Sequence, residues 1–264
     1  MTVLNSSALA GKVVLISGGT QGVGAAAART AALAGAEAVV VTGRRPEIAT
    51  ALIDELTASG TQARVLKADI SDVAQAIGSV DATIAEFGRI DCVVNAAGFT
   101  ERGTLLNTTP EMLEQHVAVN LRAPFFIMQA AVRDMLDRKA HGTIVNVLSI
   151  SARTGAPILA PYAASKGGLT SLTRNAAHAH RFDGIRINGL NIGWTSTEGE
   201  DLTQRRFHDA GDDWLEQAGD RLPAGRLGDP DEIADMIVYL LSDGSGVVTG
   251  SIIDWDQTVI GGEG

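Results

Sequence analysis

Short apolar runs alternate with longer stretches rich in alanine and leucine along the first half of the chain. The short runs are rich in β-branched residues and lie at Val13–Ser17, Ala38–Thr42, Ala63–Leu66 and Ile90–Asn95. The stretches between them have the length of helices and cover Val23–Ala34, Pro46–Ser59 and Val73–Phe87. This pattern predicts βαβ units around a parallel sheet. Right-handed crossovers would place helices on both faces of that sheet.

The same alternation continues through the second half of the chain. Helices are predicted at Pro110–Lys139, Pro161–Phe182 and Asp229–Ser242, and strands at Thr143–Leu148, Ile185–Asn191 and Ser251–Trp255. The whole pattern indicates an α/β fold with a doubly wound parallel sheet of about seven strands. No repeat or low-complexity linker divides the chain, so we expect residues 1–264 to form a single domain.

Residues 193–228 interrupt this alternation. The segment has mixed polarity, many acidic residues and only weak helical periodicity. A segment of this length inside a compact domain is usually functional, so we expect a lid over a substrate site. A solvated helical insertion is the alternative.

Composition and charge narrow the classes of function. Hydrophobic residues make up 45% of the 264 residues and charged residues 20%, which allows a large core and argues against disorder. The formal net charge is -10, and an acidic surface repels phosphate backbones, so we expect no nucleic-acid partner. A local pocket can still bind the phosphates of a cofactor.

Cysteine usage and the absence of targeting signals bear on location. Cys92 is the one cysteine, lies in an apolar run and is expected to pack in the core, so no internal disulfide can form. Met1–Ala10 lacks the regions of a signal peptide, and no apolar run approaches the roughly 20 residues of a membrane helix. We therefore expect a cytoplasmic protein without membrane association.

A glycine-rich turn joins the first predicted strand to the first predicted helix. It reads Ser17-Gly18-Gly19-Thr20-Gln21-Gly22-Val23-Gly24. Glycines let the backbone bend sharply and approach a pyrophosphate, and the helix N-terminus offers free N–H groups and a partial positive charge. Its place between strand and helix predicts a dinucleotide-binding turn rather than an ordinary tight turn.

The spacing Gly-x-x-x-Gly-x-Gly resembles that of the short-chain dehydrogenase/reductase family. Further marks of that family are Asn95-Ala96-Ala97-Gly98, Asn120, Ser149 and Tyr162-Ala163-Ala164-Ser165-Lys166, so the resemblance runs from about Lys12 to about Asp254. It implies a Rossmann-type sheet with strand order 3-2-1-4-5-6-7, a nicotinamide cofactor and a homotetramer or homodimer.

The resemblance also implies a set of cofactor-binding residues. They are Ser17, Gly18, Thr20, Gln21, Gly22, Val23, Arg44, Asp69, Ile70, Asn95, Ala96, Gly98, Tyr162, Lys166, Gly193 and Thr197. Asp69 is expected at the adenine ring, Asn95 and Gly98 beneath the cofactor, and Thr197 beside the nicotinamide amide or the phosphates.

The end of the second predicted strand bears on the choice between NAD and NADP. An acid there would bind the ribose 2′-hydroxyl and favour NAD, but the position where NAD-preferring relatives carry Asp is Gly43. Arg44 follows and is expected to clamp a 2′-phosphate, so NADP(H) is favoured and NAD(H) stays possible. The alternatives are that both arginines face solvent or that Arg44 stacks on adenine.

Tyr162 and Lys166 lie four residues apart in a predicted helix, which places them on one face. A free tyrosine has a pKa of about 10, too high for acid–base work at neutral pH. A neighbouring ammonium is expected to lower that pKa, and an oxidised nicotinamide would add to the effect. The pair is therefore expected to move the proton of a carbonyl/alcohol couple, with Lys166 also binding the nicotinamide ribose.

Two further residues complete the candidate catalytic set. Ser149 ends a strand at the ligand crevice, where its hydroxyl can bind the substrate oxygen. Asn120 is an unexpected amide in a largely apolar helix. In the family the matching residue distorts the helix and holds a water near the lysine; a buried structural amide is the alternative.

Substrate contacts are expected from Phe99, Ser149, Ser151, Arg153, Leu159 and Trp194. Trp194 and the acids Glu198, Glu200 and Asp201 would suit a hydroxylated molecule such as a sugar or polyol. No metal site is expected, because the five histidines have no partners at ligand spacing. The leading hypothesis is an NADP-linked alcohol dehydrogenase or carbonyl reductase. An NAD-linked polyol dehydrogenase is one alternative, and a dinucleotide-binding regulator without turnover is another.

The chain departs from the family pattern at three places. The proline that usually precedes Gly193 is absent, and Leu148 replaces a second serine. After the last strand, Asp254-Trp255-Asp256-Gln257 stands where relatives commonly have a glycine pair. This tail is expected to reach a neighbouring subunit or the pocket.

Overall fold

A computed structural model describes residues 5–259; the remaining ends of the expected single domain lie outside the described residues. The strands are β1 (Val13–Ser17), β2 (Ala38–Gly43), β3 (Gln62–Lys67), β4 (Cys92–Asn95), β5 (Gly142–Ser149), β6 (Ile185–Ile192) and β7 (Ile252–Trp255). All pair in parallel, in the order β3-β2-β1-β4-β5-β6-β7. The predicted sheet and strand order are confirmed.

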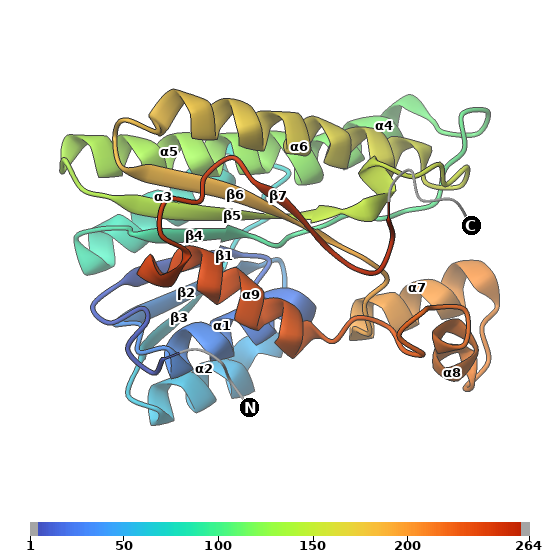
Figure 1. Ribbon diagram of the computed structural model, residues 1–264, viewed down its shortest axis with the longest axis horizontal. Coiled ribbons are helices and arrows are strands. Elements are labelled where there is room, and N and C mark those ends of the chain that lie inside the picture. The colour runs from blue at the N-terminus through green and yellow to red at the C-terminus, as the bar shows by residue number, and fades with distance from the viewer. Residues whose placement is uncertain (1–4, 260–264) are drawn as a thin grey trace.

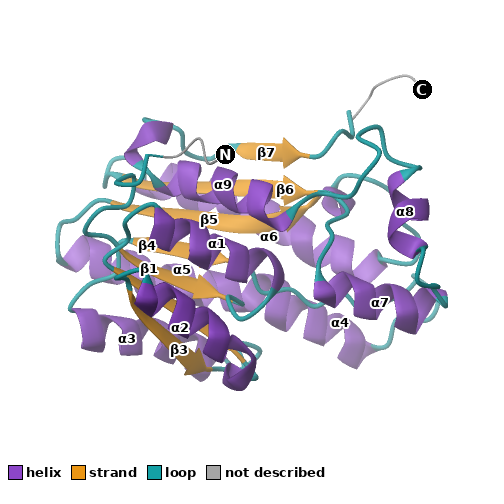
Figure 2. Ribbon diagram, turned by 90° about the horizontal axis from the view of Figure 1, so that it is seen from below, coloured by secondary structure: helices purple, strands orange, loops and turns teal. Residues whose placement is uncertain are grey.

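Helices cover both faces of the sheet (Figures 1 and 2). They are α1 (Gly22–Leu33), α2 (Thr50–Ala58), α3 (Val73–Phe87), α4 (Pro110–Val117), α5 (Ala123–Asp137), α6 (Ala160–His180), α7 (Glu198–His208), α8 (Trp214–Gly219) and α9 (Pro230–Leu241). Helices α1, α2 and α9 pack on one face, and α3, α5 and α6 on the other.

Alternation along β1 shows why the central strands read as unbroken apolar runs. Val14 and Ile16 point into the core beneath α1 and α9, while Leu15 points into the core beneath α3 and α5. All three side chains are fully buried. Successive side chains of a strand face opposite sides, so a sheet covered on both faces needs apolar residues at every position.

The single long helix expected over 110–139 is wrong. The structure has α4, a wide π-type turn over Ala118–Arg122, and then α5, which ends at Asp137. Pro124 has no N–H to donate to the carbonyl of Asn120, four residues earlier, so an unbroken α-helix would lose that bond. The wide turn lets the backbone pass this point without a regular helix.

Residues 193–228 form α7 and α8, which stand apart from the layers of the sheet (Figure 1). The two ends of the segment are joined, because the Gly228 amide donates to the Trp194 carbonyl at 2.8 Å and the Ser196 amide donates to the Gly228 carbonyl at 2.9 Å. Trp214 and Leu227 lie at the centre of a small hydrophobic cluster within the segment. The weak periodicity of the sequence thus conceals two helices with a small core of their own.

Candidate active site

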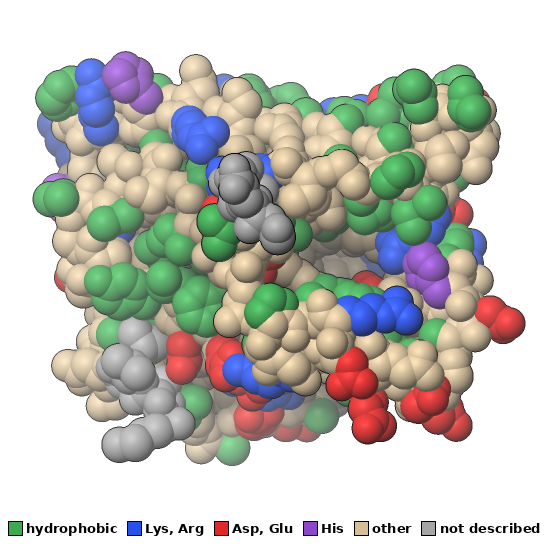
Figure 3. All heavy atoms as spheres, turned by 45° about the vertical axis from the view of Figure 1, so that its right-hand side comes forward, with side chains coloured by type: hydrophobic (Ala, Val, Ile, Leu, Met, Phe, Trp, Pro, Cys, Tyr) green, Lys and Arg blue, Asp and Glu red, His purple; other side chains and the backbone are tan. Residues whose placement is uncertain are grey.

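A cavity of about 1120 Å³ opens at the carboxyl ends of the central strands, and its hollow is visible in Figure 3. The turn after β1, the ends of β2, β4 and β5, and helices α7 and α8 contribute to its walls. Ligands of open parallel sheets bind in such a crevice.

Most of the predicted cofactor residues line this cavity. They are Gly18, Thr20, Gln21, Gly22, Val23, Arg44, Asp69, Ile70, Ala96, Gly98, Tyr162, Gly193 and Thr197. Ser17 and Asn95 lie behind the wall, where Ser17 Oγ and Asn95 Oδ1 are buried with no hydrogen-bond partner among residues 5–259. Lys166 is also buried behind the wall.

The glycine-rich turn has the tight backbone that a dinucleotide needs. Gly18 has φ +76°, and a Cβ there would lie 2.5 Å from the backbone of Ala97. A Cβ on Gly24 would lie 2.2 Å from the carbonyl oxygen of Gly18. Gln21, the N-cap of α1, makes no side-chain capping bond, so that helix N-terminus keeps unpaired N–H groups for an anion. These residues fit a pyrophosphate.

The end of β2 has no room for an acidic side chain in this arrangement. A Cβ on Gly43 would lie 2.6 Å from Cγ2 and 2.7 Å from Oγ1 of Thr20. Arg44 and Arg45 follow and both line the cavity. Thr20 therefore fills the space in which NAD-preferring relatives have an acidic side chain. Arg44 and Arg45 add two positive charges beside it.

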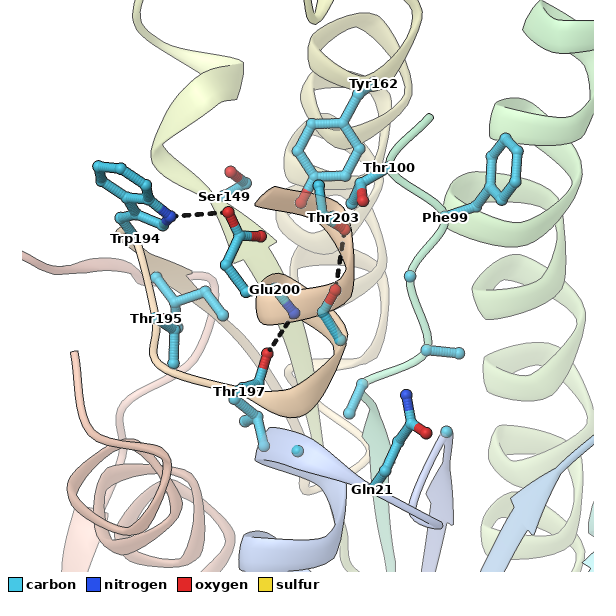
Figure 4. Close-up of a pocket in the computed structure, with 18 of the residues that line it drawn as sticks. Gln21, Phe99, Thr100, Ser149, Tyr162, Trp194, Thr195, Thr197, Glu200 and Thr203 are labelled. Carbon is cyan, nitrogen blue, oxygen red and sulfur yellow. Dashed lines mark hydrogen bonds between the residues drawn. The ribbon is translucent and has the colours of Figure 1, made fainter. Parts of the chain in front are cut away.

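Ser149 and Tyr162 face each other inside the cavity (Figure 4). Burial raises the pKa of Tyr162 above its ordinary value; a hydrogen bond with Ser149 opposes this rise, the Glu200 charge adds to it and the Arg102 charge opposes it. The expectation that Lys166 lowers this pKa is not met. Withdrawal from water outweighs the favourable neighbours of the phenolate.

Lys166 extends beneath the tyrosine into the protein interior. Its Nζ lies 6.0 Å from the centroid of the Tyr162 ring and donates to the carbonyl of Val147 at 2.7 Å. Burial lowers the pKa of Lys166 from 10.5 to about 8. Withdrawal from water therefore disfavours the charged form of the lysine.

Asn120 joins the loop after β4 to helix α6. Its Oδ1 accepts from the amide of Phe99 at 2.8 Å, and its Nδ2 donates to the carbonyl of Phe99 at 2.9 Å and to Ser165 Oγ at 3.0 Å. The side chain is fully buried. It thus fixes the segment that carries Phe99 against the helix that carries Tyr162.

Five of the six predicted substrate residues line the cavity: Phe99, Ser149, Ser151, Leu159 and Trp194. Arg153 does not; its Nη1 pairs with Asp254 of β7 at 2.5 Å. Asp254 also accepts from Asn191 Nδ2 at 2.8 Å, so β7 and its neighbours hold the arginine away from the site. The tail after β7 turns back toward the pocket wall, where Asp256 lies against Gly193.

The three acids Glu198, Glu200 and Asp201 at the start of α7 have different surroundings. Glu200 lines the cavity, whereas Glu198 is exposed outside it. Asp201 accepts from Trp214 Nε1 at 2.7 Å and from Arg205 Nε at 3.0 Å, so it belongs to the internal contacts of residues 193–228. The sequence analysis expected all three acids at the substrate, and of the three Glu200 alone lines the cavity.

The sequence interpretation missed several residues of the cavity wall, including Thr100, Arg102, Thr203, Gln204 and His208. They come from the loop after β4 and from α7. No motif marks them, because their positions depend on how this loop and residues 193–228 fold. Among the described residues, no group of three or more His, Cys, Asp or Glu side chains could hold a metal ion. The described helices also include none that could cross a membrane.

The fold and this site define a dinucleotide-binding oxidoreductase. A family model described as Enoyl-(Acyl carrier protein) reductase matches residues 18–258. The chain belongs to the short-chain dehydrogenase/reductase family, as its motifs predicted, and is an NAD(P)-dependent enzyme.

Similar proteins cover nearly the whole chain. L-rhamnose 1-dehydrogenase (NAD(P)(+)) of Azotobacter vinelandii is 35% identical over 91% of this chain and 93% of its own. Gluconate 5-dehydrogenase of Gluconobacter oxydans is 34% identical over 93% of each chain. The crystal structure of a 3-oxoacyl (acyl-carrier-protein) reductase of Agrobacterium tumefaciens with NADP bound has a TM-score of 0.85, 28% identity and 93% coverage of both chains.

Proposed function

We propose that this enzyme transfers a hydride between NADP(H) and the carbonyl or secondary-alcohol carbon of a hydroxylated small molecule such as a sugar or polyol. The observation that carries the proposal is that Ser149 and Tyr162 face the same cavity as the glycine-rich turn and Arg44. When bound, the nicotinamide supplies or accepts the hydride. Relatives named as L-rhamnose 1-dehydrogenase and gluconate 5-dehydrogenase support a sugar-like substrate.

Tyr162 moves the proton in this proposal, and Ser149 binds the reacting oxygen. Because burial raises the pKa of Tyr162, its hydroxyl is protonated at neutral pH. A protonated phenol is the form that donates to the oxygen of a carbonyl during reduction. Lys166 binds the nicotinamide ribose, and Asn120 links the site to a water that relays the proton.

NADP(H) is the preferred cofactor. Thr20 fills the space beside Gly43 that an acid would need, and Arg44 offers a guanidinium to a 2′-phosphate. NAD-linked alcohol oxidation is the second candidate, because the name of the similar L-rhamnose 1-dehydrogenase (NAD(P)(+)) includes both cofactors.

The wider organisation belongs to the same proposal. Residues 1–264 form one domain, with residues 193–228 as a lid over the substrate. The enzyme is a homotetramer or homodimer in the cytoplasm. The half-exposed Phe125 on α5 suits a subunit contact, and the buried free Cys92 suits a reducing compartment.

Paired fluorescence titrations with NADPH and NADH at one salt concentration test the cofactor assignment. We expect NADPH to bind at least about tenfold more tightly, a difference of about 1.4 kcal/mol. Tighter binding of NADH would favour the NAD-linked candidate. If neither NADPH nor NADH binds, the proposed oxidoreductase is overturned. The alternative of a regulator without turnover would then require that another ligand fills the cavity.

A further inference from the structure

Glu200 brings a carboxylate into the part of the cavity that holds Ser149 and Tyr162. It lies in the first turn of α7, and Figure 4 shows its side chain directed from that helix toward the other two residues. The proposed proton transfer does not use this group. Its position at the reacting end of the cavity therefore calls for another role.

Hydrogen bonds hold this carboxylate in one orientation. Its Oε1 accepts from Trp194 Nε1 and from Gln204 Nε2, both at 2.7 Å. The Glu200 amide donates to Thr197 Oγ1 at 3.1 Å, which fixes the start of the helix. No donor among the described residues is bonded to the other oxygen, Oε2. One oxygen is thus anchored, and the other is left for a ligand.

The opposite charge comes from Arg102, which lines the same cavity. Its Nε donates to His208 Nε2 at 3.3 Å and its Nη1 to the carbonyl of Thr100 at 3.0 Å. Glu200 and Arg102 influence the pKa of Tyr162 with opposite signs, so both charges act at the reacting position. A ligand in this part of the cavity therefore meets both a hydrogen-bond acceptor, Glu200, and a hydrogen-bond donor, Arg102, each held by its own hydrogen bonds.

Hydroxyl groups match this environment because they both donate and accept. An ionised carboxylate only accepts hydrogen bonds, so it serves a hydroxyl proton well and a second carboxylate badly. Like charges held close together in a partly desolvated site repel each other strongly. Beside Glu200 the site therefore suits a hydroxyl better than a carboxylate, even though Arg102 brings a positive charge to the same cavity.

We propose that Glu200 is a specificity-determining residue whose Oε2 accepts a hydrogen bond from a hydroxyl of a neutral polyhydroxylated substrate and rejects carboxylated analogues. The inference rests on the proposed function, because it assumes that the substrate reacts beside Tyr162. It adds the charge class of the substrate and the residue that selects it.

Paired substrates and one pair of variants test this role. The substrates are neutral polyols and the matching aldonates: sorbitol with gluconate, mannitol with mannonate, and xylitol with xylonate. Cyclohexanol serves as an alcohol without further hydroxyls. Glu200→Gln keeps the side-chain shape and removes the charge, and Glu198→Gln removes the same charge from the same turn outside the cavity. The readout is kcat/KM for oxidation with NADP+.

The native enzyme is expected to prefer at least one polyol over its aldonate by tenfold or more. Glu200→Gln should lower the polyol/aldonate and polyol/cyclohexanol ratios of kcat/KM by at least tenfold, while Glu198→Gln keeps the native ratios. Loss of the Glu200 charge should also move the rise of the pH–rate profile to lower pH, because that charge favours the protonated tyrosine. Glu198→Gln should leave the profile unchanged, because that side chain is exposed outside the cavity.

Several outcomes would overturn the inference while leaving the proposed function intact. They are preference of the native enzyme for aldonates, unchanged ratios in Glu200→Gln, or turnover of cyclohexanol without turnover of any polyol. If no alcohol or ketone is turned over, the proposed function fails. Calorimetric titration of each pair into the NADPH-loaded protein then decides the inference: tighter polyol binding that depends on Glu200 supports it, and any other result contradicts it.

Discussion

Lys166 carries an ammonium group into the interior of the protein. Its one hydrogen bond goes to the carbonyl of Val147, and burial lowers its pKa to about 8. Burying a charge costs free energy unless partners offset the loss of water. In the proposed mechanism the ribose hydroxyls of the cofactor supply further hydrogen-bond partners. The buried ammonium thus lowers the stability of the protein without cofactor and serves cofactor binding.

The pH dependence of stability tests the environment of Lys166. The ordinary pKa of 10.5 applies to the unfolded chain and about 8 to the folded chain, so between these pH values only the unfolded chain keeps the proton. The contribution of Lys166 to the free energy of unfolding should therefore rise with pH through this window, by up to about 3 kcal/mol. Urea unfolding from pH 7.5 to 10.5 should show this contribution as a difference between the native protein and Lys166→Met that grows with pH, because burial also raises the pKa of Cys92 to about 11 and that thiol lowers the stability of both proteins above pH 9. The exposed Lys67→Met is the control, and parallel curves for all three proteins would contradict the burial argument.

Arg44 is the second residue with a quantitative expectation. Arg44→Gln should weaken NADPH binding by about tenfold, because a charge-assisted bond to the 2′-phosphate contributes on the order of 1.5 kcal/mol. NADH binding should change by less than about twofold in the same fluorescence titration, since NADH lacks that phosphate. Arg133→Gln, an exposed cation on α5, is the matched control. Equal losses for the two cofactors would mean that Arg44 stacks on adenine instead.

At the scale of elements, the break between α4 and α5 places Asn120 at the site. Pro124 prevents a regular helix at this point, and the wide turn directs the amide toward Phe99 and Ser165. Three segments distant in sequence meet at this side chain. The side chain at this break in the helix therefore orders the wall on which Tyr162 stands.

Removal of that amide should cost both stability and activity. Asn120→Ala leaves the amide and carbonyl of Phe99 without their partner, and buried unpaired groups cost about 1–3 kcal/mol each. We expect the free energy of unfolding to fall by about 2–4 kcal/mol and kcat to fall with it, as measured by urea unfolding and steady-state kinetics. Asn107→Ala removes an exposed amide and should cost less than about 1 kcal/mol. A fully stable Asn120→Ala protein would contradict the joining role.

Residues 193–228 show the limit of prediction from hydrophobic periodicity. The sheet was predictable because a strand buried on both faces must be apolar at every position, as in β1. Helix α7 is short and largely polar, and it is held by contacts such as Trp214 with Asp201 that no local pattern announces. Thr203, Gln204 and His208 of this helix therefore entered the site unforeseen, whereas Glu200 was expected there.

At the scale of the whole molecule, residues of the candidate site that belong to local motifs were predictable, and residues placed by distant contacts were not. Ser149 and Tyr162 could be assigned to the cavity wall from the sequence because they belong to motifs and to the ends of regular elements. Arg153 was misplaced because its partner, Asp254, is 101 residues away in the sequence. The raised pKa of Tyr162 likewise depends on burial, which the four-residue spacing from Lys166 does not reveal.

The central claim is that Tyr162 transfers the proton in an NADP-linked redox reaction. The most direct measurement is the rate of NADPH oxidation with a panel of small ketones and keto sugars, using the native protein, Tyr162→Phe and Tyr239→Phe. Tyr239 is the other tyrosine and lies partly exposed on α9. We predict that Tyr162→Phe lowers kcat at least about a hundredfold with NADPH binding retained, since acid–base catalysis contributes about 10²–10⁴-fold. Tyr239→Phe should match the native protein, and undiminished turnover by Tyr162→Phe would contradict the account.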